Sequence, residues 1–470
     1  MMMAHKHTSR GRGHWLLPRL VLAAALLLPL AGCDTDGILE VEDPDVTLPA
    51  ALFDPANLPA LRATVVGDFA VAFGGSSATG TPGTVHASGL LADEFWHSGT
   101  FGQNREMDRR QIAITNSLVQ NMTRNLHRSR RSAMLGLASY AQNQPNTAAH
   151  AEMVNYEGYI YVFLAENFCS GVPFSEEVDG RFEYGQGEPT ENIFNRAIAS
   201  FDQALQIANA AGTGAPAVAQ QRLATMGRAR VLMDLNRYAE AAALVRDIPT
   251  TWSYDVQYSD NTGRQNNGVW GNNHGRREIA MSSREGGNGV EFRKGTATTQ
   301  NTAVNVDPRV PWSFRNGAAD TRSVHHFQLK YPTQNAPIQL ASGIQARLIE
   351  AEAALARGQS DAYLPILNAL RGTINLPALA DPGTPAARVD QFFEERALWL
   401  YATANRLSDL RRLVRQYGRN TEAVFPTGVY FRPGLDGPRQ DGVYGTDVNF
   451  PITFDEQNNP QFQQCIDRNA

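Results

Sequence analysis

The chain has 470 residues, with 42 Lys or Arg against 47 Asp or Glu, so its net charge is −5 at pH 7. A weakly acidic chain without a concentrated basic domain argues against nucleic acid as its main partner. The length is sufficient for a large hydrophobic core, and no long linker of biased composition divides it cleanly.

The first 32 residues have the pattern of a secretory signal peptide. Four basic side chains and no acidic ones accompany an apolar run from Leu20 to Leu30, which is too short for a permanent membrane-spanning helix. The run leads into Ala31-Gly32-Cys33, which resembles a bacterial lipobox, where cleavage before the cysteine leaves a sulfur that carries diacylglycerol. An ordinary small-residue cleavage site is the alternative, but it does not explain the cysteine. We expect residues 1–32 to be a lipoprotein signal peptide and Cys33 to be lipidated.

Residues 33–57 predict an extended tether, because this segment is rich in Pro and Asp and X-Pro steps disfavour helix. Several acyl chains on one terminus anchor a protein stably, since each buried methylene contributes about 0.8 kcal/mol. The folded body, residues 58–470, is therefore expected to hang from a membrane surface in an extracytoplasmic space.

Helical periodicity dominates the body. Apolar residues recur at helical spacing over residues 59–73, 108–141, 148–168, 190–205, 217–246, 342–357, 360–371 and 388–417. Residues 232–241 join a small-residue helix through a short turn to an aromatic residue and alanine, as in a tetratricopeptide helix pair. We expect a mostly α fold of tetratricopeptide-like helix pairs with one large, irregular, loop-rich face that binds ligand.

Four arginines, Arg124, Arg128, Arg130 and Arg131, fall within the predicted helix over residues 108–141. Such a cationic cluster can bind phosphate or lipid headgroups. The favoured interpretation is a solvated helix face that forms salt bridges.

Two cysteines remain after Cys33. Cys169 and Cys465 can form a disulfide bond in an oxidising compartment, or they can stay as two buried free thiols. The sequence leaves both possibilities open.

Aromatic residues in irregular segments are the positive signal for binding. Sugar rings pack their C–H faces on aromatic side chains, while nearby polar groups bond the hydroxyls. One candidate platform is Asp93, Trp96 and Phe101. A second group lies in the Asn- and Gly-rich segment from residue 250 to 337 and comprises Trp252, Tyr254, Trp270 and Trp312. For any single one of these residues, anchoring of a loop is the favoured alternative.

Catalytic motifs do not emerge from the sequence. There is no Gly-x-Ser-x-Gly, His-Glu-x-x-His or phosphate loop. His325 and His326 would point to opposite faces of a strand, and the adjacent carboxylates Asp93 and Glu94 rarely converge on one bond. We expect no enzymatic activity, no cofactor and no metal site.

Several motifs in the order in which they occur resemble the SusD/RagB family of outer-membrane nutrient-binding lipoproteins. They are Gly158-Tyr159, Gly171-Val172-Pro173, Asp307-Pro308-Arg309, Ile349-Glu350-Ala351-Glu352-Ala353, Leu367-Asn368-Ala369-Leu370-Arg371, Glu394-Glu395-Arg396, Arg406-Leu407-Ser408-Asp409-Leu410-Arg411-Arg412, Phe450-Pro451-Ile452 and Asn459-Pro460.

The resemblance implies an N-terminal SusD-like part over residues 58–250 and a C-terminal RagB/SusD part over residues 251–470. It implies four tetratricopeptide-like helix pairs that pack on a SusC-like TonB-dependent transporter. It further implies that Glu395, Arg396, Asp409 and Arg412 form structural pairs between helix neighbours.

The expected function is capture of a nutrient by a lipid-anchored protein on the outer face of the outer membrane. An oligosaccharide is the default ligand, and the resemblance equally permits a peptide. A tetratricopeptide-type envelope scaffold and, more distantly, a surface hydrolase are the alternatives from other classes of protein.

Overall fold

The computed structural model describes residues 53–178, 181–299 and 302–470. The predicted signal peptide, Cys33 and the predicted tether as far as Leu52 lie outside these residues. The described residues from Phe53 to Ala470 belong to one compact unit. Within the described ranges, no helix combines the length and the apolar character needed to cross a bilayer.

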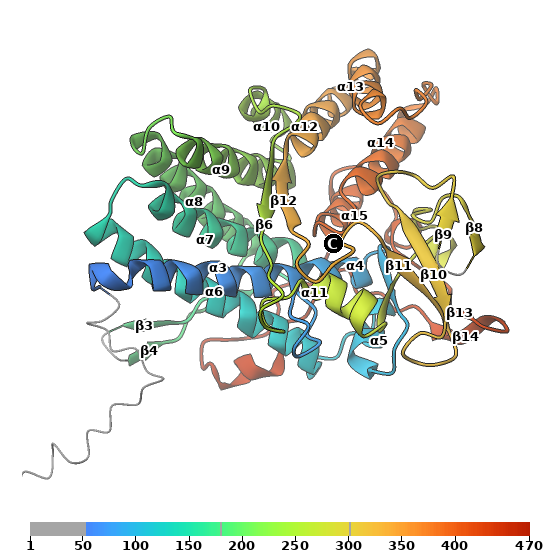
Figure 1. Ribbon diagram of the computed structural model, residues 1–470, viewed down its shortest axis with the longest axis horizontal. Helices are drawn as coiled ribbons and strands as arrows, with labels where there is room; N and C mark the ends of the chain where they lie inside the picture. Colours follow the sequence, from blue (N-terminus) through green and yellow to red (C-terminus); the bar gives the residue numbers. More distant parts are fainter. Residues whose placement is uncertain (1–52, 179–180, 300–301) are drawn as a thin grey trace, which may run out of the picture. The chain divides into compact units, whose positions relative to one another are not determined.

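Helices account for most of the regular structure, as predicted (Figure 1). Their bounds are α3 Leu58–Gly74, α4 Thr84–Leu91, α5 Gly102–Asp108, α6 Ser117–Asn143, α7 Ala148–Asn167, α8 Thr190–Ala210, α9 Ala215–Asp234, α10 Tyr238–Val245, α11 Gly268–Trp270, α12 Gly343–Ala356, α13 Ser360–Gly372, α14 Pro385–Trp399, α15 Arg406–Arg415 and α16 Thr421–Val424. Single turns also form at Pro55–Asn57, Gly271–Gly275, Glu285–Gly287 and Phe454–Asn458.

The long helices pack as successive pairs. α3 lies against α6, α7 against α8, α9 against α10 and α12 against α13, and each pair also contacts the next one along the chain. Figure 1 shows α7, α8 and α9 side by side, with α10 and α12 continuing the stack. This arrangement is the predicted series of tetratricopeptide-like pairs.

Local sequence signals explain where several of these helices begin. The side chain of Asn116 accepts hydrogen bonds from the backbone N–H groups of Leu118 and Val119, which caps α6. Thr147, Ser342 and Thr384 cap α7, α12 and α14 in the same way. These residue types are favoured at this position because their oxygen satisfies a backbone N–H that has no partner within the helix.

The core is built around α7. The sequence predicts one apolar stripe on this helix, but the structure buries nearly all of its circumference because α3, α6, α8, α9 and α15 surround it. Its rings stack on those of α3, with centroid distances of 4.2 Å from Tyr156 to Phe69 and 5.4 Å from Phe163 to Phe73.

Strands are short and pair two by two. The antiparallel pairs are β1 Phe95–His97 with β7 Ile279–Met281, β2 Val172–Pro173 with β5 Gly187–Glu188, β3 Glu176–Val178 with β4 Arg181–Glu183, β6 Ser253–Val256 with β12 Ile338–Ser342, β8 Thr296–Thr299 with β9 Thr302–Val304, β10 Trp312–Asn316 with β11 Val324–Gln328, and β13 Val429–Gly434 with β14 Gly437–Val443. The sequence predicts loop after Gly418, whereas the structure forms α16 and the β13–β14 hairpin there. The hairpin alternates buried and exposed side chains over Val429, Tyr430, Phe431 and Arg432.

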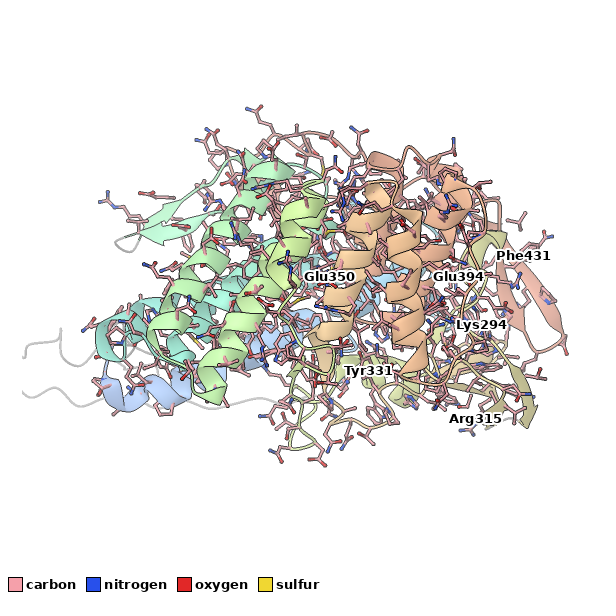
Figure 2. All side chains as sticks on the ribbon, turned by 90° about the horizontal axis from the view of Figure 1, so that it is seen from above. Lys294, Arg315, Tyr331, Glu350, Glu394 and Phe431 are labelled. Atoms are coloured by element: carbon pink, nitrogen blue, oxygen red, sulfur yellow. A yellow bond between two sulfur atoms is a disulfide. The ribbon has the colours of Figure 1, made fainter. Side chains whose placement is uncertain are left out.

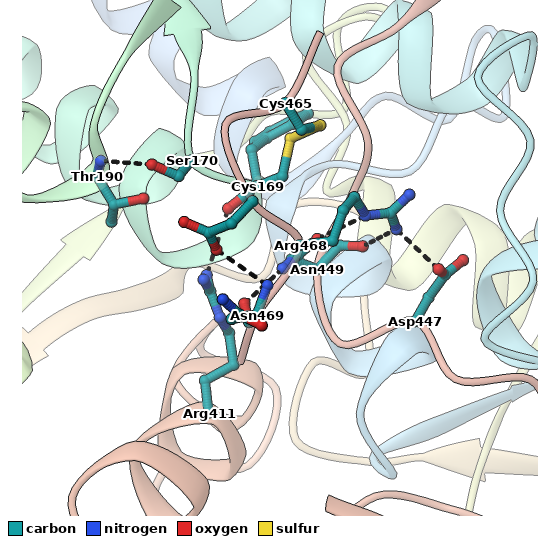
Figure 3. The surroundings of a disulfide bond; sticks show 11 residues. Cys169, Ser170, Thr190, Arg411, Asp447, Asn449, Cys465, Arg468 and Asn469 are labelled. Atoms are coloured by element: carbon teal, nitrogen blue, oxygen red, sulfur yellow. Dashed lines mark hydrogen bonds and ion pairs between the residues drawn. A yellow bond between two sulfur atoms is a disulfide. The ribbon is translucent and has the colours of Figure 1, made fainter.

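Cys169 and Cys465 form a disulfide bond, so the disulfide alternative is the one that the structure contains (Figure 3). The bond joins the end of α7 to the C-terminal segment across 296 residues of sequence. Hydrogen bonds fix the same segment, because Arg468 donates to Asp447 and to Asn449 at 2.8 and 3.0 Å.

Removal of the disulfide should destabilise the protein. On the chain-entropy model, closure of a loop of 296 residues contributes about 5–6 kcal/mol. We expect the Cys169→Ser/Cys465→Ser variant to unfold at lower urea concentration than the wild type, with the C-terminal segment becoming sensitive to protease. Two free thiols in the denatured, unreduced wild type would contradict the bond.

A buried network of charged groups on α15 connects the helix pairs to the irregular part. Arg412 pairs with Glu352 of α12 and with Asp409 on its own helix, and Asp409 also accepts from Arg396 of α14 at 2.8 Å. Arg411 donates to the carbonyl oxygen of Glu166 at the end of α7, at 2.5 Å. Burial opposes ionisation of Asp409, but the two arginines lower its pKa overall. α15 therefore connects α7, α12 and α14.

The resemblance predicts that Glu395, Arg396, Asp409 and Arg412 pair with helix neighbours. Only the pair of Asp409 with Arg412 is confirmed. Glu395 pairs with Arg309 and Arg371 instead, at 2.6 Å each. Adjacent residues on a helix point in different directions, so Glu395 and Arg396 must find partners on other elements.

Truncation of Arg412 tests this network. The Arg412→Ala variant leaves Glu352 and Asp409 buried with fewer cations, which should cost about 3–5 kcal/mol of unfolding free energy. The control is Arg419→Ala, because Arg419 forms a solvent-exposed pair with Asp390 and should contribute no more than about 1 kcal/mol. Urea denaturation measures both, and equal losses would contradict a special role for α15.

Candidate functional site

Asp93 lies in the interior and not on a ligand surface. Its carboxylate accepts two hydrogen bonds from the Arg406 guanidinium, at 2.6 and 2.8 Å, and one from the backbone N–H of Val290 at 2.9 Å. These partners satisfy the buried charge, as burial requires. Asp93 therefore does not contribute to a solvent-accessible surface in this structure.

Trp96 is also buried. It lies on β1 opposite Ala280, and the Arg432 guanidinium stands 5.8 Å from its ring centroid. Phe101, in contrast, is 49% exposed at the start of α5. The predicted platform of Asp93, Trp96 and Phe101 therefore does not form one solvent-accessible surface, and only Phe101 remains available to a ligand.

Trp312 anchors a loop. It is buried on β10, and its indole N–H donates to the carbonyl oxygen of Lys294 at 2.8 Å. Lys294 in turn pairs with Glu394 of α14 at 2.8 Å, and both residues are labelled in Figure 2. Trp312 therefore anchors a loop, which is the alternative stated for these aromatic residues, because its ring and its N–H both face protein.

Trp252 and Trp270 are half-buried. Trp252 packs against the hydrophobic core. Trp270 ends α11 and stacks on His274, with a centroid distance of 6.3 Å. Neither residue lines the groove that contains the remaining candidate, Tyr254.

Tyr254 lies in a groove of about 760 Å³ between α3, α7 and the segment from β6 to α11. We call this the tyrosine groove. Its central polar and aromatic residues are Arg62, Asp68, Glu152, Tyr156, Tyr254, Tyr258 and Arg264.

A chain of hydrogen bonds crosses the groove around Tyr254. The hydroxyl of Tyr254 contacts that of Tyr156 at 3.1 Å and donates to Glu152 Oε1 at 3.2 Å. Arg62 on α3 holds the same carboxylate with Nε at 2.6 Å and Nη2 at 3.1 Å. Two aromatic hydroxyls, a carboxylate and a guanidinium are therefore fixed within one small region.

A second polar pair borders the groove farther along α3. Arg264 donates to Asp68 Oδ1 at 2.6 Å, and Ser132 donates to Asp68 Oδ2 at 2.6 Å. The Arg264 side chain remains half exposed, so its other N–H groups can reach a ligand.

The third tyrosine, Tyr258, is placed by close packing on α3. Its hydroxyl donates to the Ala70 carbonyl oxygen at 3.1 Å. A Cβ at Gly74 would lie 2.2 Å from this hydroxyl oxygen, so the glycine is needed for the approach. Burial raises the pKa of Tyr156, Tyr254 and Tyr258, so these hydroxyls stay neutral hydrogen-bonding groups.

Most residues of the tyrosine groove were not predicted. Tyr156 falls within the helical periodicity over residues 148–168, and the sequence pattern does not single out Arg62, Glu152 or Arg264. Charged residues on otherwise apolar helices can indicate such a polar site, because a charge at a core-facing position needs a partner. The sequence does not show that the partner of Glu152 comes from α3, 90 residues away.

His325 and His326 contact separate parts of the protein. His325 contacts the Asn273 carbonyl oxygen at 2.7 Å through Nε2 and Ser98 Oγ at 3.1 Å through Nδ1, while His326 packs beside Trp312. Over the residues that the structure describes, no group of three or more His, Cys, Asp or Glu side chains is placed to hold a metal ion.

Solved structures resemble this chain in fold. A SusD superfamily protein from Bacteroides vulgatus is 16% identical and matches over 88% of this chain and 99% of its own, with a TM-score of 0.61. Surface glycan-binding protein A from Bacteroides uniformis is 15% identical over 87% of this chain and 99% of its own, with a TM-score of 0.60. No protein-family model and no curated protein matches the sequence.

These matches define the class of fold: a mostly helical body of tetratricopeptide-like pairs with an irregular face. The chain has the fold of the SusD superfamily, and the resemblance predicted from its sequence motifs is confirmed.

Glu94, next to Asp93, should make stability depend on pH. Burial raises its pKa from 4.5 to about 8, despite the hydrogen bond from the Ala402 N–H and the nearby cations Arg406 and Lys330. The folded state thus favours the protonated acid. Its contribution to stability is complete below about pH 4.5 and is lost as pH rises through 8.

The Glu94→Gln variant should therefore lose less unfolding free energy than the wild type between about pH 5 and pH 8, because the amide cannot ionise. Urea denaturation across this range measures the difference. Glu183→Gln, at an exposed strand position, is the control and should follow the wild type. Parallel curves for Glu94→Gln and the wild type would refute the assignment.

Proposed function

We propose that this chain is a non-enzymatic binding protein that holds an oligosaccharide in the tyrosine groove. The observation that carries the proposal is the group formed by Tyr254, Tyr156, Glu152 and Arg62 in a groove of about 760 Å³. Neutral hydroxyls, carboxylates and guanidinium groups bond sugar hydroxyls, and tyrosine rings pack against the C–H faces of the sugar.

The comparisons support the same class of ligand. Among the proteins with this fold, one is described as a surface glycan-binding protein and another, from Bacteroides vulgatus, as a SusD-like carbohydrate binding protein. The latter is 12% identical over 86% of this chain, with a TM-score of 0.60. At such identity the ligand itself does not transfer, so the groove remains the main argument.

Binding should depend on polar groups of the groove that are not needed for folding. A glycan array screen identifies a ligand, and calorimetry then compares variants. We expect Arg264→Ala and Tyr254→Phe each to weaken binding about tenfold, the loss of one hydrogen bond to a charged or polar partner. The thermal midpoint should fall only modestly, because Asp68 keeps Ser132 and Glu152 keeps Arg62 as partners.

The matched control is Arg357→Ala, an exposed arginine outside the groove. Equal affinity of Arg264→Ala and Arg357→Ala would reject the groove as the site. Binding of peptides but of no oligosaccharide would favour the peptide alternative, and binding of neither would favour an envelope scaffold.

We further propose that the protein is anchored to the outer membrane through lipid on Cys33 and delivers its ligand to a SusC-like TonB-dependent transporter. The lipobox-like sequence supports the anchor. The helix pairs supply a broad, rigid surface for a partner, while the groove opens beside β6. A lasting contact of this kind should bury about 1,600 Å² or more.

Two measurements on cells test the anchor and the partner. Cys33→Ala should abolish labelling by a fatty-acid analogue and release the protein from the membrane fraction. Mild detergent extraction of the wild type should recover an outer-membrane barrel protein in near-equal amount. An unlabelled wild type would reject lipidation, and recovery of the protein alone in several detergents, with ligand present, would reject the partner.

A further inference from the structure

A second groove lies on another part of the molecule, bounded by α6, the β3–β4 hairpin and the turn at Phe454–Asn458. Its volume is about 620 Å³. We call it the arginine groove, and its defining residues are Arg124, His127, Arg128, Arg130, Arg131 and Phe182. It shares no lining residue with the tyrosine groove.

Positive charge is concentrated on one side of this groove. Arg124, Arg128 and Arg131 follow one another at spacings of four and three residues, so they occupy neighbouring positions on one face of α6. Like charges at these spacings disfavour a helix by a few tenths of a kcal/mol each. An anion bound between them would remove this cost.

Part of the charge is already balanced, which fixes the geometry of the site. Arg124 pairs with Asp455 at 2.7 Å, and Arg130 donates to the Ser175 carbonyl oxygen at 2.8 Å and to Glu176 at 3.3 Å. Arg130 also lies 5.3 Å from the ring centroid of Phe174. These two arginines are held in place and frame the groove.

Arg128 stands between them and is exposed. No ion pair or hydrogen bond links its side chain to another residue within 53–178, 181–299 or 302–470. Its guanidinium therefore presents a planar set of N–H donors to the groove, the geometry that recognises tetrahedral oxyanions in two-point contacts.

His127 adds a polar group without a positive charge. Burial lowers its pKa to about 3, with Arg130 acting in the same direction, so the ring is neutral near pH 7. Its Nε2 atom has no hydrogen-bond partner among the described residues. An unsatisfied nitrogen beside a ligand groove destabilises the protein, and a bound acceptor would offset this cost after a small rotation of the ring.

Apolar side chains also line the groove, beside its polar groups, which include the carboxylates Glu176, Asp455 and Glu456. Phe182 on β4 is 73% exposed, an unusual position for an aromatic ring, and Met134, Leu135 and Pro173 line the same space. A free inorganic ion would leave this surface uncovered. An oxyanion attached to a sugar ring or to a glycerol unit would cover it.

We propose that the arginine groove binds a phosphate or sulfate monoester, with the oxyanion against Arg128 and the carbon skeleton against Phe182. Two sources carry this chemistry: a sugar ester, which would extend the range of glycans bound, and the headgroup of an anionic lipid, which would orient the protein on a membrane. The site goes beyond the proposed function, because it lies outside the tyrosine groove.

Calorimetry on the full chain at constant ionic strength tests the oxyanion contact. Inorganic phosphate should bind to the wild type, and Arg128→Gln should weaken it about tenfold, as loss of one charge-assisted contact predicts. Arg315→Gln is the matched control, since Arg315 is an equally exposed arginine on β10 (Figure 2). Absence of phosphate binding, or equal weakening by both substitutions, would overturn the proposal.

Two esters test the apolar contact and distinguish the sources. At least one of glucose 6-sulfate and glycerol 3-phosphate should bind more tightly than inorganic phosphate, the first indicating a sugar ester and the second a lipid headgroup. Phe182→Ser should remove this gain and leave phosphate affinity unchanged. If neither ester exceeds inorganic phosphate, or if Phe182→Ser weakens all three equally, the proposed contact with Phe182 is wrong.

Discussion

The fold depends on the buried ion network of α15. Arg412, Asp409 and their partners Glu352 and Arg396 bring four charges into a low-dielectric interior, where each is tolerated only because the others are present. Because displacement of one helix would leave buried charges unpaired, α12, α14 and α15 must keep their relative positions together. Arg406 extends the network to Asp93, so the segment before β1 is held by the same helix. The ion pairs of α15 therefore link the helical part of the protein to the irregular part.

Packing also preorganises the tyrosine groove, the proposed ligand site. α3 and α7 are locked together by ring stacking beneath the tyrosine groove, so Arg62 and Glu152 meet without a ligand to induce them. A preorganised site loses less entropy on binding than a mobile one. The loops that follow β6 complete one wall. α3 and α7 thus contribute both to the core and to the proposed ligand groove.

The sequence predicted the fold more fully than the site, for physical reasons. Helices such as α3 and α7 are indicated by local periodicity and capping residues, and the order of motifs around Asp409 indicated the family fold. Solvent exposure of a loop aromatic depends on distant segments. Trp96 is covered because β7 pairs with β1 from almost 200 residues away, and no local pattern predicts this. The environment of Asp93 depends similarly on Arg406.

The disulfide bond has a consequence for the order of events during folding. Cys169 becomes buried at the end of α7, whereas its partner follows 296 residues later in the chain. The Cys169 thiol is synthesised long before the Cys465 thiol and has to stay reachable until the second one arrives. The bond can therefore form only after the final segment has packed beside the end of α7, so it is present only in a chain that includes Cys465.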